Sequence, residues 1–246
     1  MKKKILALVV NIVRHSDTTD VATLYSREEG RLSVAVPARS KGRRSTNPPL
    51  MPLTVIEGEV SSRTGMELMR LWRFSIAEPL GALHSDPAKI AVGMFMSEFL
   101  GRLLREQAPD PAVWRAVATA LLRLNEEENP LRVANFHIIF LWQMLPPAGI
   151  MPDIGSFRAD EPQQWLDMRS GIYTSLRPGH SDVVVPQYAG VPLLLERLNF
   201  RSSHCLRITG EQRSLLADAL LHYYAVHLPG MGGMKSHRVL TEVFRF

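Results

Sequence analysis

The chain has 246 residues, 46% hydrophobic and 22% charged, which is the composition of a globular protein with a full core. Its single cysteine, Cys205, excludes an internal disulfide framework and any zinc site built from several thiolates. Residues 1–80 contain 13 Lys and Arg against 8 Asp and Glu, whereas residues 81–246 contain 16 of each. The whole formal charge of +5 therefore lies in the first third, which indicates a polyanion-binding part joined to a neutral one.

The first residues, MKKKILALVVNIV, combine three lysines with a short apolar run, as a signal peptide does. No small-residue cleavage site follows the run, so a strand is the better interpretation. The longest later apolar stretch, residues 135–145, is too short to span a membrane. We therefore expect a cytoplasmic protein that does not associate with membranes.

The first 80 residues contain five β-rich segments separated by turn residues. These segments are residues 4–14, 21–27, 30–39, 53–63 and 66–78. A five-stranded barrel of this length has the size of an OB-fold, whose loops and one open face bind nucleic acid. We therefore predict an α+β protein of two domains, with an OB-fold β-barrel over residues 1–80.

From residue 85 the signals become those of helices. Asp86, Asp110 and Asn129 each stand as a capping residue directly before a proline at the first helical position. Residues 209–212 (TGEQ) form a capping box, and Gly230 should end the helix that this box opens. Prolines at positions 146, 147, 152, 162 and 178 interrupt the segment between the third and the last of these predicted helices. We predict an all-α domain over residues 81–246 with a long irregular insertion at about 147–184.

A basic loop, VPARSKGRRS at residues 36–45, joins the third and fourth predicted strands and contains no acid. Either the loop is merely solvated or it binds an anion. The charge excess of the same domain favours binding to DNA phosphate, since a handful of cations can supply most of a non-specific affinity. The candidate DNA-binding residues here are Arg39, Lys41, Arg43, Arg44, Lys2, Lys3, Lys4 and Arg14.

Few aromatic residues in this region could stack on bases. Tyr25, Trp72 and Phe74 are either core residues, which is the interpretation that we favour, or stacking platforms. Binding should therefore depend on phosphates and ignore base sequence. A sparser basic run near the other end of the chain is either a solvated or acid-paired surface or a second contact to the DNA backbone. It consists of Arg197, Arg201 and Arg207.

No motif in the chain indicates catalysis or a native metal site. The stretch GMGGMKS at residues 230–236 lacks the spacing of a phosphate-binding loop and follows a predicted helix rather than a strand. His222 and His227 are five residues apart, a spacing that does not place two metal ligands on one helical face. We expect a protein that is not an enzyme and needs no cofactor or metal.

Three segments in the same order resemble the bacterial RecO family of recombination mediators. They are ALVVNIVRHSDTTDVATLYSREEGRLSVAVPARSK near the start, GIMPDIGSF with WLDMRSGIYTS in the insertion, and HLPGMGGMKSHRVLTEVF near the end. The resemblance covers nearly the full chain. It implies an OB-fold followed by a helical domain.

The resemblance also implies a function. Members bind single- and double-stranded DNA without sequence preference, anneal complementary strands, and with RecR help to load RecA onto DNA coated by the single-strand binding protein SSB. The acidic, apolar-ended tail of SSB is an expected partner, and its site should pair a cation with an apolar groove on the helical domain. The sequence does not place this site, although Arg132 beside the apolar residues 131–145 is a candidate.

The chain departs from the family in one respect. Many members carry a four-cysteine zinc site in the insertion, but there is no cysteine between Gly149 and Pro178. Zinc is therefore not expected, and we predict an apolar cluster in its place, around Ile154, Phe157, Trp165 and Tyr173.

The residues also allow a second hypothesis about function. The chain could be a protein-interaction module whose basic barrel docks an acidic partner, with DNA binding incidental. Salt-titrated binding to single-stranded DNA separates this hypothesis from that of a DNA-binding mediator.

Overall fold

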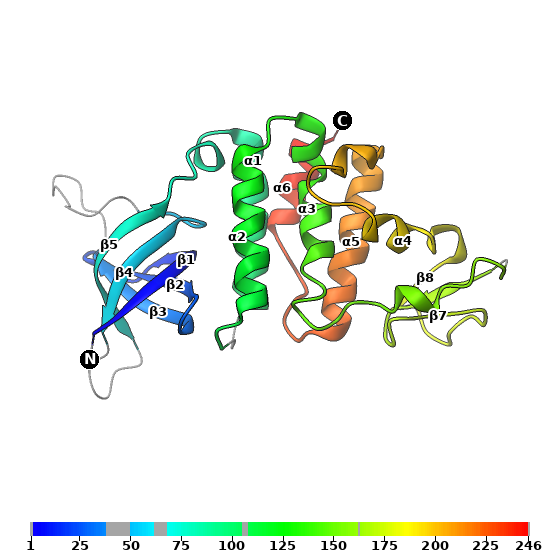
Figure 1. Ribbon diagram of the computed structural model, residues 1–246, viewed down its shortest axis with the longest axis horizontal. Helices are drawn as coiled ribbons and strands as arrows, with labels where there is room; N and C mark the ends of the chain where they lie inside the picture. The colour runs from blue at the N-terminus through cyan, green and yellow to red at the C-terminus, as the bar shows by residue number, and fades with distance from the viewer. Residues whose placement is uncertain (1, 38–49, 62–67, 105–107, 162, 246) are drawn as a thin grey trace. The chain divides into compact units, whose positions relative to one another are not determined.

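The computed structural model describes residues 2–37, 50–61, 68–104, 108–161 and 163–245 (Figure 1). The chain divides into two compact units, an N-terminal unit Met1–Asn125 and a C-terminal unit Glu126–Phe246. The N-terminal unit contains both the strands of the first third and the two helices that follow them. The change from strands to helices near residue 80 agrees with the sequence, while a division into functional domains at that residue stays a prediction.

The N-terminal unit is built on a closed barrel with the strand order β1-β2-β3-β5-β4 (Figure 1). Its strands are β1 (Lys2–Arg14), β2 (Thr19–Ser26), β3 (Gly30–Pro37), β4 (Val55–Ser61) and β5 (Met69–Glu78). All neighbours pair antiparallel except β3 and β5, whose parallel pairing closes the ring. The predicted five-stranded, OB-like barrel is confirmed.

The alternation of apolar residues along the strands explains why the barrel forms. In β3, every second residue from Gly30 to Val36 is buried, because successive side chains of a strand point to opposite faces. The barrel core consists of Ile5, Ala7, Val9, Ala22, Leu24, Leu32, Val34, Val36, Ile56, Val60 and Leu71. Exposed cations remain on the barrel surface at Lys2 and Lys4 of β1 and at Arg70 and Arg73 of β5.

Helices α1 (Pro87–Leu103) and α2 (Pro111–Glu126) follow the barrel. Both begin as predicted, since a carboxylate of Asp86 or Asp110 accepts hydrogen bonds from backbone N–H groups of the first helical turn. On the outer side of β1, Ser97 Oγ donates to the carbonyl of Val10 at 2.6 Å, which ties α1 to the barrel.

Two further barrel side chains fix these helices. Arg31 Nη1 donates to the carbonyls of Gly101 and Leu104 at 3.4 and 3.2 Å, which satisfies free carbonyls at the C-terminal end of α1. The Tyr25 hydroxyl accepts the Asp110 N–H at 3.1 Å, and its ring stacks on Trp114. Tyr25 is thus a core residue, as interpreted from the sequence, and burial raises the pKa of its hydroxyl.

The C-terminal unit contains the helices α3 (Pro130–Gln143), α4 (Val191–Glu196), α5 (Gly210–His227) and α6 (Ser236–Val243). The capping box of Thr209 and Gln212 opens α5 as predicted. This helix ends at His227, before Gly230, because Leu228 precedes Pro229 and a residue before proline is driven out of the helical conformation. Its Tyr224 hydroxyl donates to the Leu141 carbonyl at 2.8 Å, joining α5 to α3.

The insertion is more regular than expected. It contains a three-stranded sheet of order β7-β6-β8, formed by β6 (Trp165–Asp167), β7 (Ile172–Thr174) and β8 (Val183–Val184). The predicted apolar cluster is present, but Leu166 rather than Trp165 packs into it with Tyr173. Adjacent residues of a strand face opposite sides, so Trp165 instead lies beside the guanidinium of Arg177.

Candidate nucleic-acid interface

The basic loop, with Arg39, Lys41, Arg43 and Arg44, lies outside the described residues. Its flanking strands are described: β3 ends at Pro37 and β4 begins at Val55. The loop therefore connects two strands of the barrel, as the sequence predicted, and its DNA contacts stay a prediction.

The lysines at the start of β1 take different positions. Lys2 is exposed and lies 3.7 Å from Glu59, whereas Lys3 Nζ donates to Glu29 at 2.6 Å. Lys4 is exposed on the same face of the strand as Lys2. Because exposed ion pairs are weak and easily exchanged, Lys2 and Lys4 remain able to contact an anionic ligand.

Arg14, at the far end of β1, is engaged within its own turn. Its Nε donates to the carbonyl of Ser16 at 2.9 Å and lies 3.8 Å from Asp20. A second nitrogen donates to the carbonyl of Asp17. Arg14 thus organises the β1–β2 turn, and a phosphate would have to compete with these contacts.

One aromatic residue departs from its expected place. Phe74 packs against the barrel core, as interpreted, but Trp72 is 43% exposed, so its assignment to the core is wrong. Lys2 Nζ lies 5.2 Å and the Arg70 guanidinium 4.5 Å from the centre of the Trp72 ring. Sequence reasoning missed both Arg70 and Arg73, which are also exposed on β5.

Arg197, Arg201 and Arg207 are exposed on the C-terminal unit, around the 3-10 turn Ser203–Cys205. Among the described residues, none of the three forms an ion pair with a carboxylate. An acid-paired surface therefore does not account for these arginines. Solvation or a contact to an anionic ligand are the remaining interpretations.

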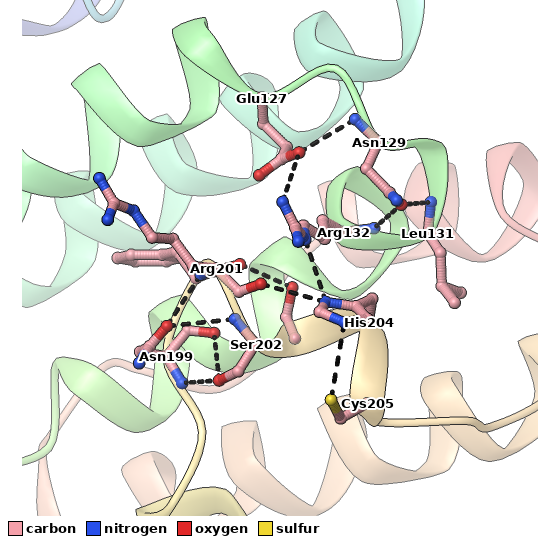
Figure 2. Close-up of polar contacts among 11 residues, drawn as sticks. Glu127, Asn129, Leu131, Arg132, Asn199, Arg201, Ser202, His204 and Cys205 are labelled. Atoms are coloured by element: carbon pink, nitrogen blue, oxygen red, sulfur yellow. Dashed lines mark hydrogen bonds and ion pairs between the residues drawn. The ribbon is translucent and has the colours of Figure 1, made fainter.

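Arg132, the candidate cation for the SSB tail, belongs to an internal network (Figure 2). Its Nε donates to Nδ1 of His204 at 3.0 Å, and its Nη1 lies 3.6 Å from Glu127. The Glu127 carboxylate is largely shielded from solvent and offsets the charge of Arg132. Arg132 is therefore less suited to an acidic peptide than its position in the sequence indicated.

A cleft of about 640 Å³ lies between α5, α6 and the segment that joins them. Its apolar lining is Leu221, Ala225, Met231 and Met234. Its charged lining includes the exposed Arg238 beside the acids Asp218 and Glu242. At its edge, Arg169 and His222 hydrogen-bond to Asp182, and these bonds lower the pKa of the Asp182 carboxyl.

The cleft also brings Ser214, His237 and Asp218 together. Ser214 Oγ lies 3.5 Å and Asp218 Oδ1 3.1 Å from the same ring nitrogen of His237, Nε2. A catalytic triad needs the serine and the acid on different ring nitrogens, so that one orients the ring while the other takes the proton. This arrangement does not supply that relay.

The described residues contain no group of three or more His, Cys, Asp or Glu side chains arranged to hold a metal ion. Within the same residues, no helix is long and apolar enough to cross a membrane.

Comparison with known proteins identifies the family. The family model described as "Recombination protein O C terminal" matches residues 84–237. The protein named DNA repair protein RecO from Bacteroides fragilis is 30% identical over 247 residues, covering 99% of this chain and all of the relative. The chain belongs to the RecO family. Relatives with the same name in Phocaeicola vulgatus and Porphyromonas gingivalis are 30% and 28% identical, covering 99% and 97% of this chain and 100% and 97% of their own lengths.

The RecO assignment confirms the resemblance that the three sequence segments indicated, and with it a role in DNA repair and recombination. RecO proteins are recombination mediators rather than enzymes, which agrees with the prediction that this chain is not an enzyme. In this member, the cluster of Leu166, Tyr173 and Ala189 packs the insertion. The Tyr173 hydroxyl donates to the Ala189 carbonyl at 2.8 Å and closes the cluster without any thiolate ligand.

Proposed function

We propose that this RecO family member binds single- and double-stranded DNA without sequence preference and anneals complementary strands. With a RecR-type partner, it helps to load RecA onto single-stranded DNA coated by SSB, in the cytoplasm. The observation that carries the proposal is that the whole charge excess lies in the first 80 residues, which form an OB-like barrel.

The barrel and the exposed arginines support binding to the DNA backbone. Lys2, Lys4, Arg70 and Arg73 are exposed on the barrel, and the basic loop adds four further cations in the sequence. Arg197, Arg201 and Arg207 supply a second basic surface on the C-terminal unit. Contacts of this kind neutralise phosphates and carry no direct base information, which suits a protein that acts on any strand.

The cleft between α5 and α6 is a better candidate for the SSB tail than Arg132. It combines an apolar wall with the exposed Arg238, the pairing that an acidic, apolar-ended peptide requires. Asp218 and Glu242 would oppose an acidic ligand, so Arg238 must supply the attraction.

Strand annealing tests the proposal. The full chain is mixed with complementary oligonucleotides at physiological salt, and duplex formation is followed by energy transfer between end labels. We expect the chain to accelerate annealing over the rate without protein, for AT-rich and GC-rich pairs alike. A variant that combines Arg197→Ser, Arg201→Ser and Arg207→Ser should accelerate annealing less than the wild-type chain does. Absence of both DNA binding and annealing, together with tight binding of an acidic peptide to the barrel, would instead favour the protein-interaction module.

A further inference from the structure

A β-bulge on β5 changes which side chains the barrel presents. Between the pairs Gly58–Phe74 and Val60–Leu71, the single residue Glu59 of β4 faces two residues of β5. These two residues, Trp72 and Arg73, are both exposed, whereas a regular strand would turn one of them inward. Bulges of this kind re-aim side chains, and here the bulge places an indole on the outside of the barrel.

Neighbouring groups hold the indole in place. Its Nε1–H donates to Ser61 Oγ at 2.5 Å. The strand registers align Lys2 of β1 with Ser61 of β4, and Ser61 with Arg70 of β5. The same two cations, Lys2 and Arg70, lie over the ring at 5.2 and 4.5 Å from its centre. Cation–π contacts at exposed sites are weak, so a stacking base can displace a cation from the ring face. The indole is thus both exposed and fixed in orientation.

The charge around the indole is predominantly positive. Among the described residues, no carboxylate pairs with Arg70 or Arg73, and Lys2 has only the loose, exposed contact to Glu59. This pattern of a flat apolar ring between cations is complementary to a base between two phosphates. It is less suited to an apolar protein surface, because the contact partners of the indole, Lys2, Arg70 and Ser61, are charged or carry a hydroxyl.

We propose that Trp72 is a base-stacking platform for single-stranded DNA, with Arg70, Arg73 and Lys2 contacting the flanking phosphates. The inference rests on the proposed function and adds a residue that distinguishes single-stranded from double-stranded DNA. Base–aromatic stacking accepts every base, so the platform does not introduce sequence preference. In a duplex both faces of each base are already stacked, so the platform favours single strands over double strands.

The test compares oligonucleotides that share phosphates but differ in bases. Fluorescence anisotropy measures binding of the full chain to a thymidine oligonucleotide and to an abasic oligonucleotide of equal length. The wild-type chain should prefer the thymidine strand. Trp72→Ala should weaken thymidine binding about 5- to 150-fold and leave abasic binding unchanged, whereas Trp72→Phe should retain most of the preference.

The salt dependence separates stacking from charge. Trp72→Ala should keep the wild-type slope of log affinity against log salt, whereas Arg70→Ala with Arg73→Ala should lower it by roughly 0.7 for each phosphate that the variant no longer neutralises. Tyr188→Ala, which removes an exposed aromatic ring from the C-terminal unit, is the matched control and should change nothing. Thermal unfolding by circular dichroism checks that each variant is folded.

Equal affinity of the wild-type chain for the thymidine and abasic strands would overturn the stacking platform while leaving DNA binding intact. No binding to either strand would overturn the proposed function itself. If Trp72→Ala binds both strands like wild type but loses a protein partner, the indole is a protein-docking residue and the inference is wrong.

Discussion

His137 of α3 should make the stability of the C-terminal unit depend on pH. The ring is 2% exposed, and burial together with the nearby cationic groups of His237 and Arg213 lowers its pKa from 6.5 to about 3. The pKa in the folded chain lies below that in the unfolded chain, so the neutral ring favours folding above pH 6.5. That stability is lost as the pH falls from about 6.5 toward about 3.

The size of this effect follows from the two pKa values. Each unit costs about 1.4 kcal/mol, so at pH 5 the wild-type chain should have lost about 2 kcal/mol of unfolding free energy through His137 alone. The His137→Leu variant has no group that can be protonated at this position. It should therefore not lose the roughly 2 kcal/mol of unfolding free energy that the wild-type chain loses through His137. Urea unfolding of both proteins at pH 8 and pH 5 measures the difference.

The comparison between variants removes the contribution of other titrating groups. His15→Leu, at an exposed position of the N-terminal unit, is the control and should keep the wild-type pH dependence. If His137→Leu loses as much stability between pH 8 and pH 5 as the wild-type chain does, the pKa of His137 is not lowered by burial in the folded chain.

Two further predictions concern the insertion and the cleft. The purified chain should contain far less than one equivalent of zinc, because its sequence lacks the thiolates that close a structural site; stoichiometric zinc that survives chelation would refute this. A labelled peptide with acidic residues and an apolar end should bind the full chain. Arg238→Glu places a like charge against the peptide and should weaken binding about tenfold or more, whereas Arg132→Ala should change it little. If Arg132→Ala weakens peptide binding more than Arg238→Glu does, as measured by fluorescence anisotropy, the peptide binds at Arg132 instead.

The barrel and most helix starts could be predicted because their signals are local. Turn residues separate the strands, and each of Asp86, Asp110 and Asn129 precedes a proline that can occupy only the first helical turn. The small sheet of the insertion could not be predicted, since its strands have only two or three residues and show no alternation.

The candidate site was predicted less completely than the fold. The exposure of Trp72 depends on a bulge opposite Glu59, and the sequence carries no mark of a register shift between two strands. Similarly, Arg31 looks like any strand cation, but its contacts to Gly101 and Leu104 form only when α1 is in place. The first depends on the register between two consecutive strands, and the second on contacts between residues 70 and 73 positions apart in the sequence.

The salt dependence of binding to single-stranded DNA tests the central claim most directly. The wild-type chain is compared with a variant carrying Ser or Ala in place of Arg39, Lys41, Arg43 and Arg44. We expect these changes to cost little stability, because four closely spaced cations add no apolar core. We predict weaker binding at all base compositions and a slope of log affinity against log salt that falls by roughly 0.7 for each phosphate that the variant no longer neutralises. A folded variant with the affinity and salt slope of the wild-type chain would contradict the claim that the basic loop of the barrel binds DNA.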